Sequence, residues 1–309
     1  MAKGARVWRR LLLCMVMAAS IGVPSAGAQV DAGGKAATPS ASPSPRAVRN
    51  RRDVGPTADR IGFVVGNVEY LLVHEIAHLI ITEKDIPIVG PVENAADYLA
   101  TLALMLEEPL DREHEDRGRQ FLLAAAGAFA ASWEVGRAVG AEMPYWDEHG
   151  LSIQRYHQIA CLLYGSDPAG LAGLRRDTGM PEVRAQACIG EYARAERVFE
   201  WVMRDYGRRP DDGPGAPVEI VYGEPPTTVS SDVLRQLKSM ALLERVTARL
   251  HERFTLDRPV TLVMRSCGRR EAAWLPDSRQ LVICYELFDA LYLLGGRAAA
   301  PGRQGGRDR

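Results

Sequence analysis

Residues 61–81 read IGFVVGNVEYLLVHEIAHLII, a stretch in which almost every turn of a helix would carry large aliphatic side chains. Such a pattern predicts a helix that is buried on most of its faces and begins near Asn67. Three ionisable residues, His74, Glu75 and His78, lie in the middle of this apolar run. Because an ionisable side chain in a core is costly unless it is satisfied, these residues need partners.

The same three residues form the motif HExxH. Residues four apart share one face of a helix, so the imidazoles of His74 and His78 can bind a single metal ion. Glu75 lies on the flank of that face. There it can take a proton from water, whose pKa zinc lowers to about 7. The alternative is a pair of histidines hydrogen-bonded within a helical core, which the apolar flanks disfavour.

A third metal ligand is expected from residues 93–97, which follow a segment rich in Pro and Gly. Glu93 and Asp97 are four apart on a predicted helix, 92–107. Glu93 can therefore bind the metal while Asp97 accepts the outer N–H of a ligand histidine. Two alternatives remain open: Asp97 is the ligand instead, or Glu93 only stabilises the start of the helix.

The N-terminal residues resemble an export signal. Four basic residues precede an apolar run over 11–23, and Ala26-Gly27-Ala28 follows it. We expect a signal peptide over 1–28 that is cleaved after Ala28, and a secreted or periplasmic protein. An uncleaved anchor is the alternative. Residues 29–58 contain almost no large apolar side chains and predict a disordered linker.

The remaining sequence predicts several helices and a β-hairpin. Three further helical segments are expected: one over 121–139, one that ends at 164 and one over 181–206. They complete a catalytic domain spanning 59–206. A Pro/Gly/Asp-rich linker is expected at 207–228. The unit 229–295 then contains a helix capped by Ser231 and running to 254, and a hairpin of strands 260–265 and 280–285. Residues 296–309 predict a disordered tail.

Four cysteines remain after the leader, and an even number in an exported chain favours two disulfides. Three pairings are possible. We prefer Cys161 with Cys188 and Cys267 with Cys284, because each bond would close a local loop. Each would thereby constrain the unfolded chain and stabilise the fold by about 3 kcal/mol. Four buried thiols are the alternative, and zinc binding by these cysteines is disfavoured because none is in a CxxC pair.

The composition excludes some partners. The formal net charge of −1 gives no global field to attract nucleic acid or an anionic membrane surface. No stable membrane insertion is expected after the leader is cleaved. A chain that is 47% hydrophobic can bury a sizeable core.

Residues 63–97 resemble the metallopeptidase family DUF4344, and the element Glu93-x-x-x-Asp97 is similar to that of the thermolysin-like gluzincins. The likeness extends to 145–150, to the segments around the four cysteines and so to most of the mature chain. It implies a mainly helical α+β fold, with a zincin-like metallopeptidase domain and a small C-terminal helix plus β-hairpin unit. It also implies zinc as cofactor and a peptide or protein substrate.

The chain departs from the gluzincin pattern in two respects. The connection from His78 to Glu93 is shorter than is usual there, which leaves the third ligand open. Too few residues precede the metal helix to form the sheet whose edge strand aligns a substrate. The hairpin near 260–285 is expected to supply that sheet instead.

By analogy with the oriented histidine of thermolysin-like sites, His149 is the candidate that steadies the developing oxyanion, with Asp147 to orient it. Arg155, Tyr145 and His157 are alternates. The predicted function is a zinc-dependent metallopeptidase in which zinc and Glu75 activate the attacking water. The alternatives are a non-catalytic zinc-binding envelope protein and a zinc amidase acting on cell-wall material.

Overall fold

Nine helices and a four-stranded sheet make up residues 58–106 and 112–298, which are the residues that the computed structural model describes. They lie in one compact unit. The mainly helical α+β class is therefore confirmed. The expected signal peptide, the expected linker up to residue 57 and the tail after residue 298 lie outside the described residues.

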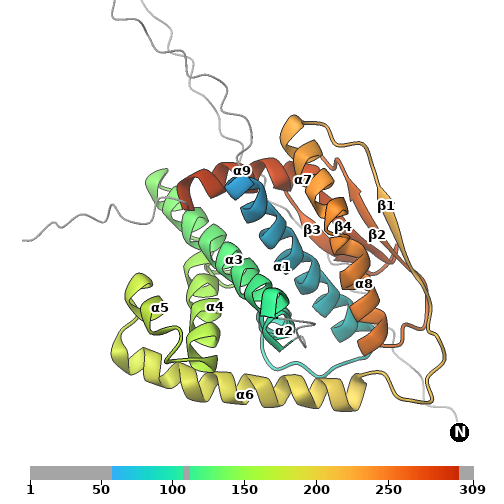
Figure 1. The fold of residues 1–309 in the computed structure, drawn as a ribbon, viewed down its shortest axis with the longest axis horizontal. Coiled ribbons are helices and arrows are strands. Elements are labelled where there is room, and N and C mark those ends of the chain that lie inside the picture. Colours follow the sequence, from blue (N-terminus) through green and yellow to red (C-terminus); the bar gives the residue numbers. More distant parts are fainter. Residues whose placement is uncertain (1–57, 107–111, 299–309) are drawn as a thin grey trace, which may run out of the picture. The chain divides into compact units, whose positions relative to one another are not determined.

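Helix α1 (Ala58–Glu83) is the central element of the fold. It contacts α2 (Val92–Leu106) and α3 (Arg112–Ala138) on one side and α9 (Tyr285–Ala298) and strand β3 (Ala272–Leu275) on another (Figure 1). The helix begins before Asn67, which is buried and whose amide donates to the carbonyls of Phe63 and Ala124. Within the described residues α1 alone is long and apolar enough to cross a membrane, but 83% of its apolar window is buried inside the protein.

Helices α2 and α3 flank α1. Helix α2 (Val92–Leu106) follows a turn in which Asp85 and Gly90 have positive φ. Helix α3 (Arg112–Ala138) starts earlier than predicted, because the charged run before Phe121 continues the helix. A Cβ on Gly66 would lie 2.9 Å from the ring of Phe121, so the glycine allows α1 and α3 to approach closely.

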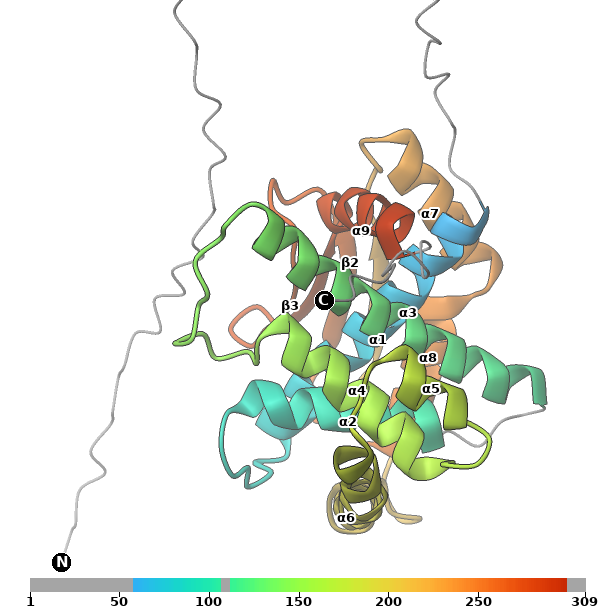
Figure 2. The same ribbon diagram turned by 90° about the vertical axis from the view of Figure 1, so that its left-hand side faces the viewer.

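A second group of helices packs beyond α3. It consists of α4 (Ser152–Ser166), the short α5 (Ala172–Asp177) and α6 (Glu182–Tyr206). Helix α4 contacts both α3 and α6. The connection from α3 to α4 is a long loop (Figure 2), and it contains His149.

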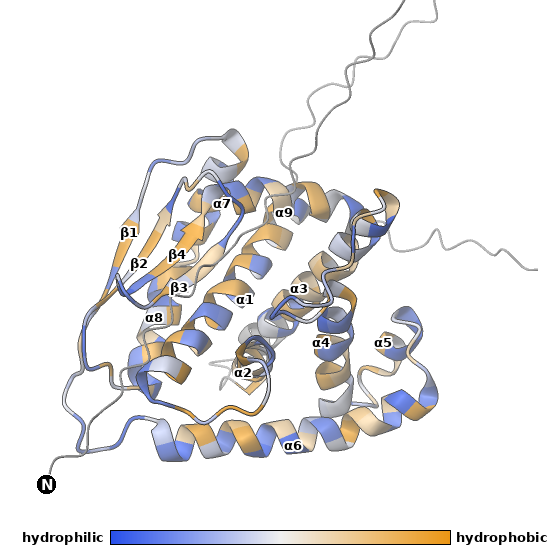
Figure 3. Cartoon of the chain, turned by 180° about the vertical axis from the view of Figure 1, so that it is seen from behind, coloured by the Kyte–Doolittle hydropathy of each residue, from blue (hydrophilic) through white to orange (hydrophobic). Residues whose placement is uncertain are grey.

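The sheet has the strand order β1-β2-β4-β3, formed by β1 (Val218–Tyr222), β2 (Val260–Arg265), β4 (Gln280–Cys284) and β3 (Ala272–Leu275). Apolar residues dominate its strands (Figure 3). Strands β1, β2 and β4 are parallel, and only β3 is antiparallel to its neighbour β4. The predicted hairpin between 260–265 and 280–285 is thus wrong in its pairing. The hairpin consists of β3 and β4, because residues 272–275 reverse direction through the turn at 276–279.

Three further boundaries differ from the prediction. The expected linker 207–228 contains strand β1. The expected single helix from Ser231 to 254 is two helices, α7 (Thr228–Ser239) and α8 (Leu242–Arg253), separated by Ala241 in a left-handed conformation. Thr227, not Ser231, caps α7, and its hydroxyl accepts the N–H of Ser230. Helix α9 (Tyr285–Ala298) follows β4 directly where no helix was expected, and it includes residues 296–298 of the expected tail.

Both preferred disulfides are present. Cys161–Cys188 joins α4 to α6, and Cys267–Cys284 ties the start of the β2–β3 connection to the end of β4. Disulfides persist in oxidising compartments, so the two bonds indicate a location outside the cytoplasm.

We predict that the double variant Cys161→Ser/Cys188→Ser unfolds with a free energy about 3 kcal/mol lower than that of the native protein, because a 27-residue loop is no longer closed in the unfolded chain. Urea denaturation followed by circular dichroism measures the difference. An unchanged denaturation midpoint, with the disulfide shown intact in the native protein by peptide mapping, would contradict the prediction.

Candidate metal centre

Three side-chain atoms meet at the junction of α1 and α2. The Nε2 atoms of His74 and His78 are 3.1 Å apart, and Oε2 of Glu93 lies 3.2 Å from the first and 3.1 Å from the second. The histidines project from the same face of α1, and Glu93 lies in the first turn of α2. The structure therefore brings together the three predicted ligands, although they come from two helices.

This triangle of atoms fits a zinc ion. Zinc–nitrogen bonds of 2.0–2.1 Å in a tetrahedron place neighbouring ligand atoms about 3.3 Å apart. The three observed distances are close to that value, and two imidazoles with one carboxylate are a common zinc ligand set. Burial alone would raise the pKa of Glu93, but contacts with the neighbouring imidazoles hold it well below its usual range. The carboxylate is thus ionised, as a metal ligand must be.

Asp97 lies behind His74. Its Oδ1 is 2.9 Å from Nδ1 of His74, although the ring N–H is not well aligned with it, and the same oxygen accepts the hydroxyl of Tyr70 at 2.9 Å. Arg155 donates to both carboxylate oxygens at 2.7 and 2.6 Å. Burial alone would raise the pKa of Asp97, but His74 and Arg155 lower it to about 2. Asp97 therefore faces the outer nitrogen of His74, and Glu93 faces the inner one.

The same surroundings hold His74 in place. Burial alone would lower the pKa of its imidazole, but the carboxylates of Asp97 and Glu93 raise it to about 9. The side chain is 3% exposed and so has little freedom to turn away.

Glu75 points to a different neighbour, the C-terminal sheet. Its Oε2 accepts the backbone N–H of Trp274 in β3 at 2.7 Å, so a residue 199 positions away completes this side of the centre. Burial raises the pKa of Glu75, and the nearby imidazoles of His74 and His78 oppose that rise. No sequence motif marks Trp274. Only the expectation that a C-terminal strand reaches the metal helix could have indicated it.

His149 reaches the centre from the loop between α3 and α4. Its Nε2 is 2.9 Å from Oε2 of Glu93, and its ring stacks beside that of His74 at a centroid distance of 6.3 Å. Asp147 accepts the backbone N–H of His149 and lies 3.1 Å from its Nδ1. Unlike the side chains of His74 and His78, the side chain of His149 is 47% exposed, so it lies on the solvent side of the cluster.

The alternates for the role of His149 lie elsewhere. Arg155 is engaged with Asp97, and its guanidinium lies 4.1 Å from the ring centre of Phe129. Tyr145 is exposed on the loop, and His157 packs beside Tyr156 on α4.

A family model described as "Putative metallopeptidase", DUF4344, matches residues 47–203 and 222–301. The chain belongs to this family. The matched segments include every residue of the candidate metal centre described above, both those between Tyr70 and His149 and Trp274. No curated protein and no solved structure gives a match. Membership implies a metal and a protein substrate, and the cluster of His74, Glu93 and His149, whose ligand atoms lie within 4.8 Å of one another, can hold a metal.

Two overlapping sets of ligand atoms are thus available, one with His78 and one with His149. We favour the set with His78, because its three distances match a tetrahedron and His78 is fixed on a helix. His149 is on a loop and is more exposed.

We predict that Glu93→Gln lowers zinc affinity by more than about 100-fold, whereas Asp97→Asn lowers it by about 10- to 100-fold, the range for a residue that only orients a ligand. Competition with a chromogenic chelator measures both affinities, and circular dichroism checks that each variant is folded. If Asp97→Asn lost more affinity than Glu93→Gln, the assignment of the third ligand would be reversed.

Proposed function

We propose that the protein is a zinc-dependent peptidase that acts outside the cytoplasm, with His74, His78 and Glu93 as ligands and Glu75 as general base. The observation that carries the proposal is the triangle of two imidazole nitrogens and one carboxylate oxygen beside a buried glutamate. Family membership supports the class of reaction. The two disulfides and the predicted leader support export.

Bound zinc would polarise the scissile carbonyl and lower the pKa of water. Glu75 then accepts a proton from the attacking water. Its Oε2 is already held by the N–H of Trp274, which leaves Oε1 to take the proton. When the C–N bond breaks, the same carboxyl gives this proton to the nitrogen of the leaving amine. The raised pKa of Glu75 suits both transfers, because the group must bind a proton and release it in each cycle.

His149 is placed to stabilise negative charge that develops on the carbonyl oxygen. Its Nε2 lies beside the ligand oxygen of Glu93, so a carbonyl at the metal is within its reach. Contact with Glu93 raises the pKa of the His149 imidazole, and the carboxylate of Asp147 near Nδ1 adds to the rise. Both changes favour the protonated ring, in which Nδ1–H faces Asp147 and Nε2–H is a donor. A donor of this kind contributes about 100- to 1000-fold to kcat in hydrolases that stabilise an oxyanion.

Strand β3 offers an edge for the substrate. The carbonyl of Glu271 accepts the N–H of Cys284 and so faces β4, whereas the N–H of Trp274 faces Glu75. Because backbone groups alternate along a strand, those of Ala272 point to the same outer side as those of Trp274. A peptide can add to this outer edge as a further strand, which would place its backbone next to Glu75.

We predict that Glu75→Gln retains zinc but loses at least about 100-fold in kcat, because the general base is removed. Cleavage of a peptide library, with muropeptides in a parallel assay, measures the activity. Persistence of every native activity in a zinc-loaded variant would rule out the enzyme proposal. Cleavage of muropeptides alone would replace the peptidase with a cell-wall amidase.

His149→Ala is expected to keep native zinc affinity and lose about 100- to 1000-fold in kcat. His157→Ala, on the neighbouring helix, is the matched control and should remain active. If zinc affinity fell as far in His149→Ala as in His78→Ala, His149 would be a ligand instead.

A further inference from the structure

An apolar groove lies between helices α1, α2, α6 and α8. Its volume is about 410 Å³, and its apolar lining includes Ile76, Ile80, Leu99 and Val202. Successive residues of a helix are about 100° apart, so Ile76 and Ile80 lie on a different side of α1 from His74. None of the proposed metal ligands lines the groove.

One side of the groove is strongly basic. Arg245, Arg249 and Arg253 of α8 all line it, with Glu252 as its acidic member. Arg245 and Arg249 also line a second, smaller cavity of about 20 Å³, which they share with Arg117 of α3 and with Glu69 of α1. The apolar groove and the basic cavity are thus adjacent.

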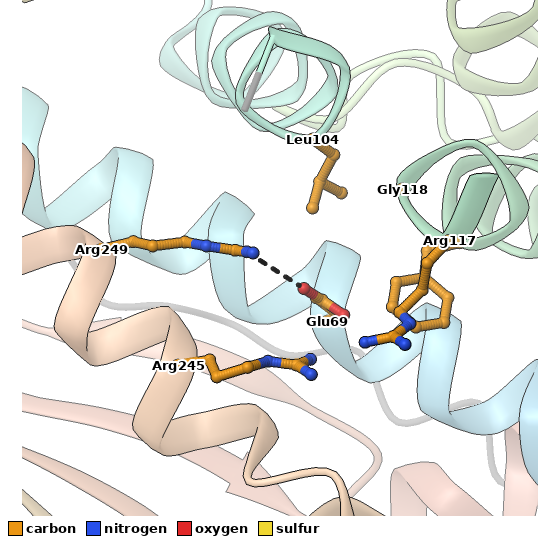
Figure 4. Close-up of a pocket in the computed structure, with 7 residues that line it drawn as sticks. Glu69, Leu104, Arg117, Gly118, Arg245 and Arg249 are labelled. Atoms are coloured by element: carbon orange, nitrogen blue, oxygen red, sulfur yellow. Dashed lines mark ion pairs between the residues drawn. The ribbon is translucent and has the colours of Figure 1, made fainter. Parts of the chain in front are cut away.

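In Figure 4 the side chains of Arg117, Arg245 and Arg249 converge around Glu69, and Arg249 forms an ion pair with it at 3.9 Å. A guanidinium carries five N–H donors. Each arginine can therefore keep its present partners and still bind a further anionic oxygen.

We propose that the groove binds a long-chain carboxylate of the fatty-acid type, with the chain on the apolar floor and the carboxylate at Arg245 and Arg249. The groove volume lies in the range of small-molecule sites, which are mostly apolar with a few polar groups that fix orientation. The basic cavity has room for about one water-sized group, which suits a carboxylate oxygen and excludes a bulky headgroup.

Charge argues against the chain's own terminal segments as the occupant. Residues 46–52 read RAVRNRR, and residues 299–309 contain three arginines and one aspartate. Both segments are basic, and neither carries an apolar run that would fill the groove. The apolar run over 11–23 belongs to the leader that is expected to be cleaved after Ala28. A monoanionic ligand with one long chain matches the basic rim and the apolar floor together.

Isothermal titration of the full-length protein below the critical micelle concentration tests the proposal. Dodecanoate should bind with 1:1 stoichiometry, and decanoate about 15-fold more weakly, because each buried methylene contributes about fourfold to affinity. Dodecyl maltoside and dodecyltrimethylammonium should bind at least tenfold more weakly than dodecanoate. Equal binding of all three 12-carbon ligands, or no binding of dodecanoate, would overturn the proposal.

Two variants locate the site. Arg245→Gln should weaken dodecanoate binding at least about tenfold through loss of a charged donor, whereas Arg235→Gln on α7, the matched control, should not change it. Ala248→Trp, on the exposed side of the groove, should abolish binding by filling it. If Arg245→Gln fails to fold, Ala248→Trp and the comparison of dodecanoate with decanoate still test the proposal. Native affinity in Ala248→Trp would place any bound carboxylate elsewhere and overturn the proposal.

Discussion

A buried carboxylate, that of Asp97, connects the helices on which the metal centre depends. It is on α2, and it contacts Tyr70 and His74 of α1 and Arg155 of α4. An unpaired charge in this position would cost several kcal/mol, so the carboxylate and the guanidinium require each other. Their pairing ties α2 to α4, and the contacts of Asp97 with Tyr70 and His74 tie α2 to α1. Glu93, one turn earlier on α2, then reaches the nitrogens of His74 and His78.

The local part of this arrangement could be predicted from the sequence. Spacing of four residues within a helix places His74 with His78 and Glu93 with Asp97, and the Pro/Gly turn brings the second helix back to the first. The pairing of the nearby cysteines could also be predicted from the sequence, because each bond closes a short loop. These features depend on residues that are close in the chain, where helix geometry or loop length decides the outcome.

The long-range part could not be predicted. Strand 260–265 alternates and is aliphatic whichever neighbour it has, so its sequence does not distinguish an antiparallel hairpin from the observed parallel pairing with β4. The N–H of Trp274 is a backbone group, and any residue except proline at that position would donate it to Glu75. The ion pair of Arg155 with Asp97 joins two residues that are 58 positions apart on different helices, and no local pattern encodes it.

Helix α1 combines two environments that are usually separate. One face carries the polar residues of the metal centre, and another carries Ile76 and Ile80 of the apolar groove. Helix α2 likewise contributes Glu93 to the first and Leu99 to the second. Because both helices are closely packed, a change in their separation at the groove also changes it at the proposed metal ligands. A ligand in the groove would alter metal binding only if it bound one arrangement of the two helices more tightly than another. By the same linkage, zinc would then change the affinity of the groove for its ligand by an equal factor, so the two sites are coupled in both directions or in neither.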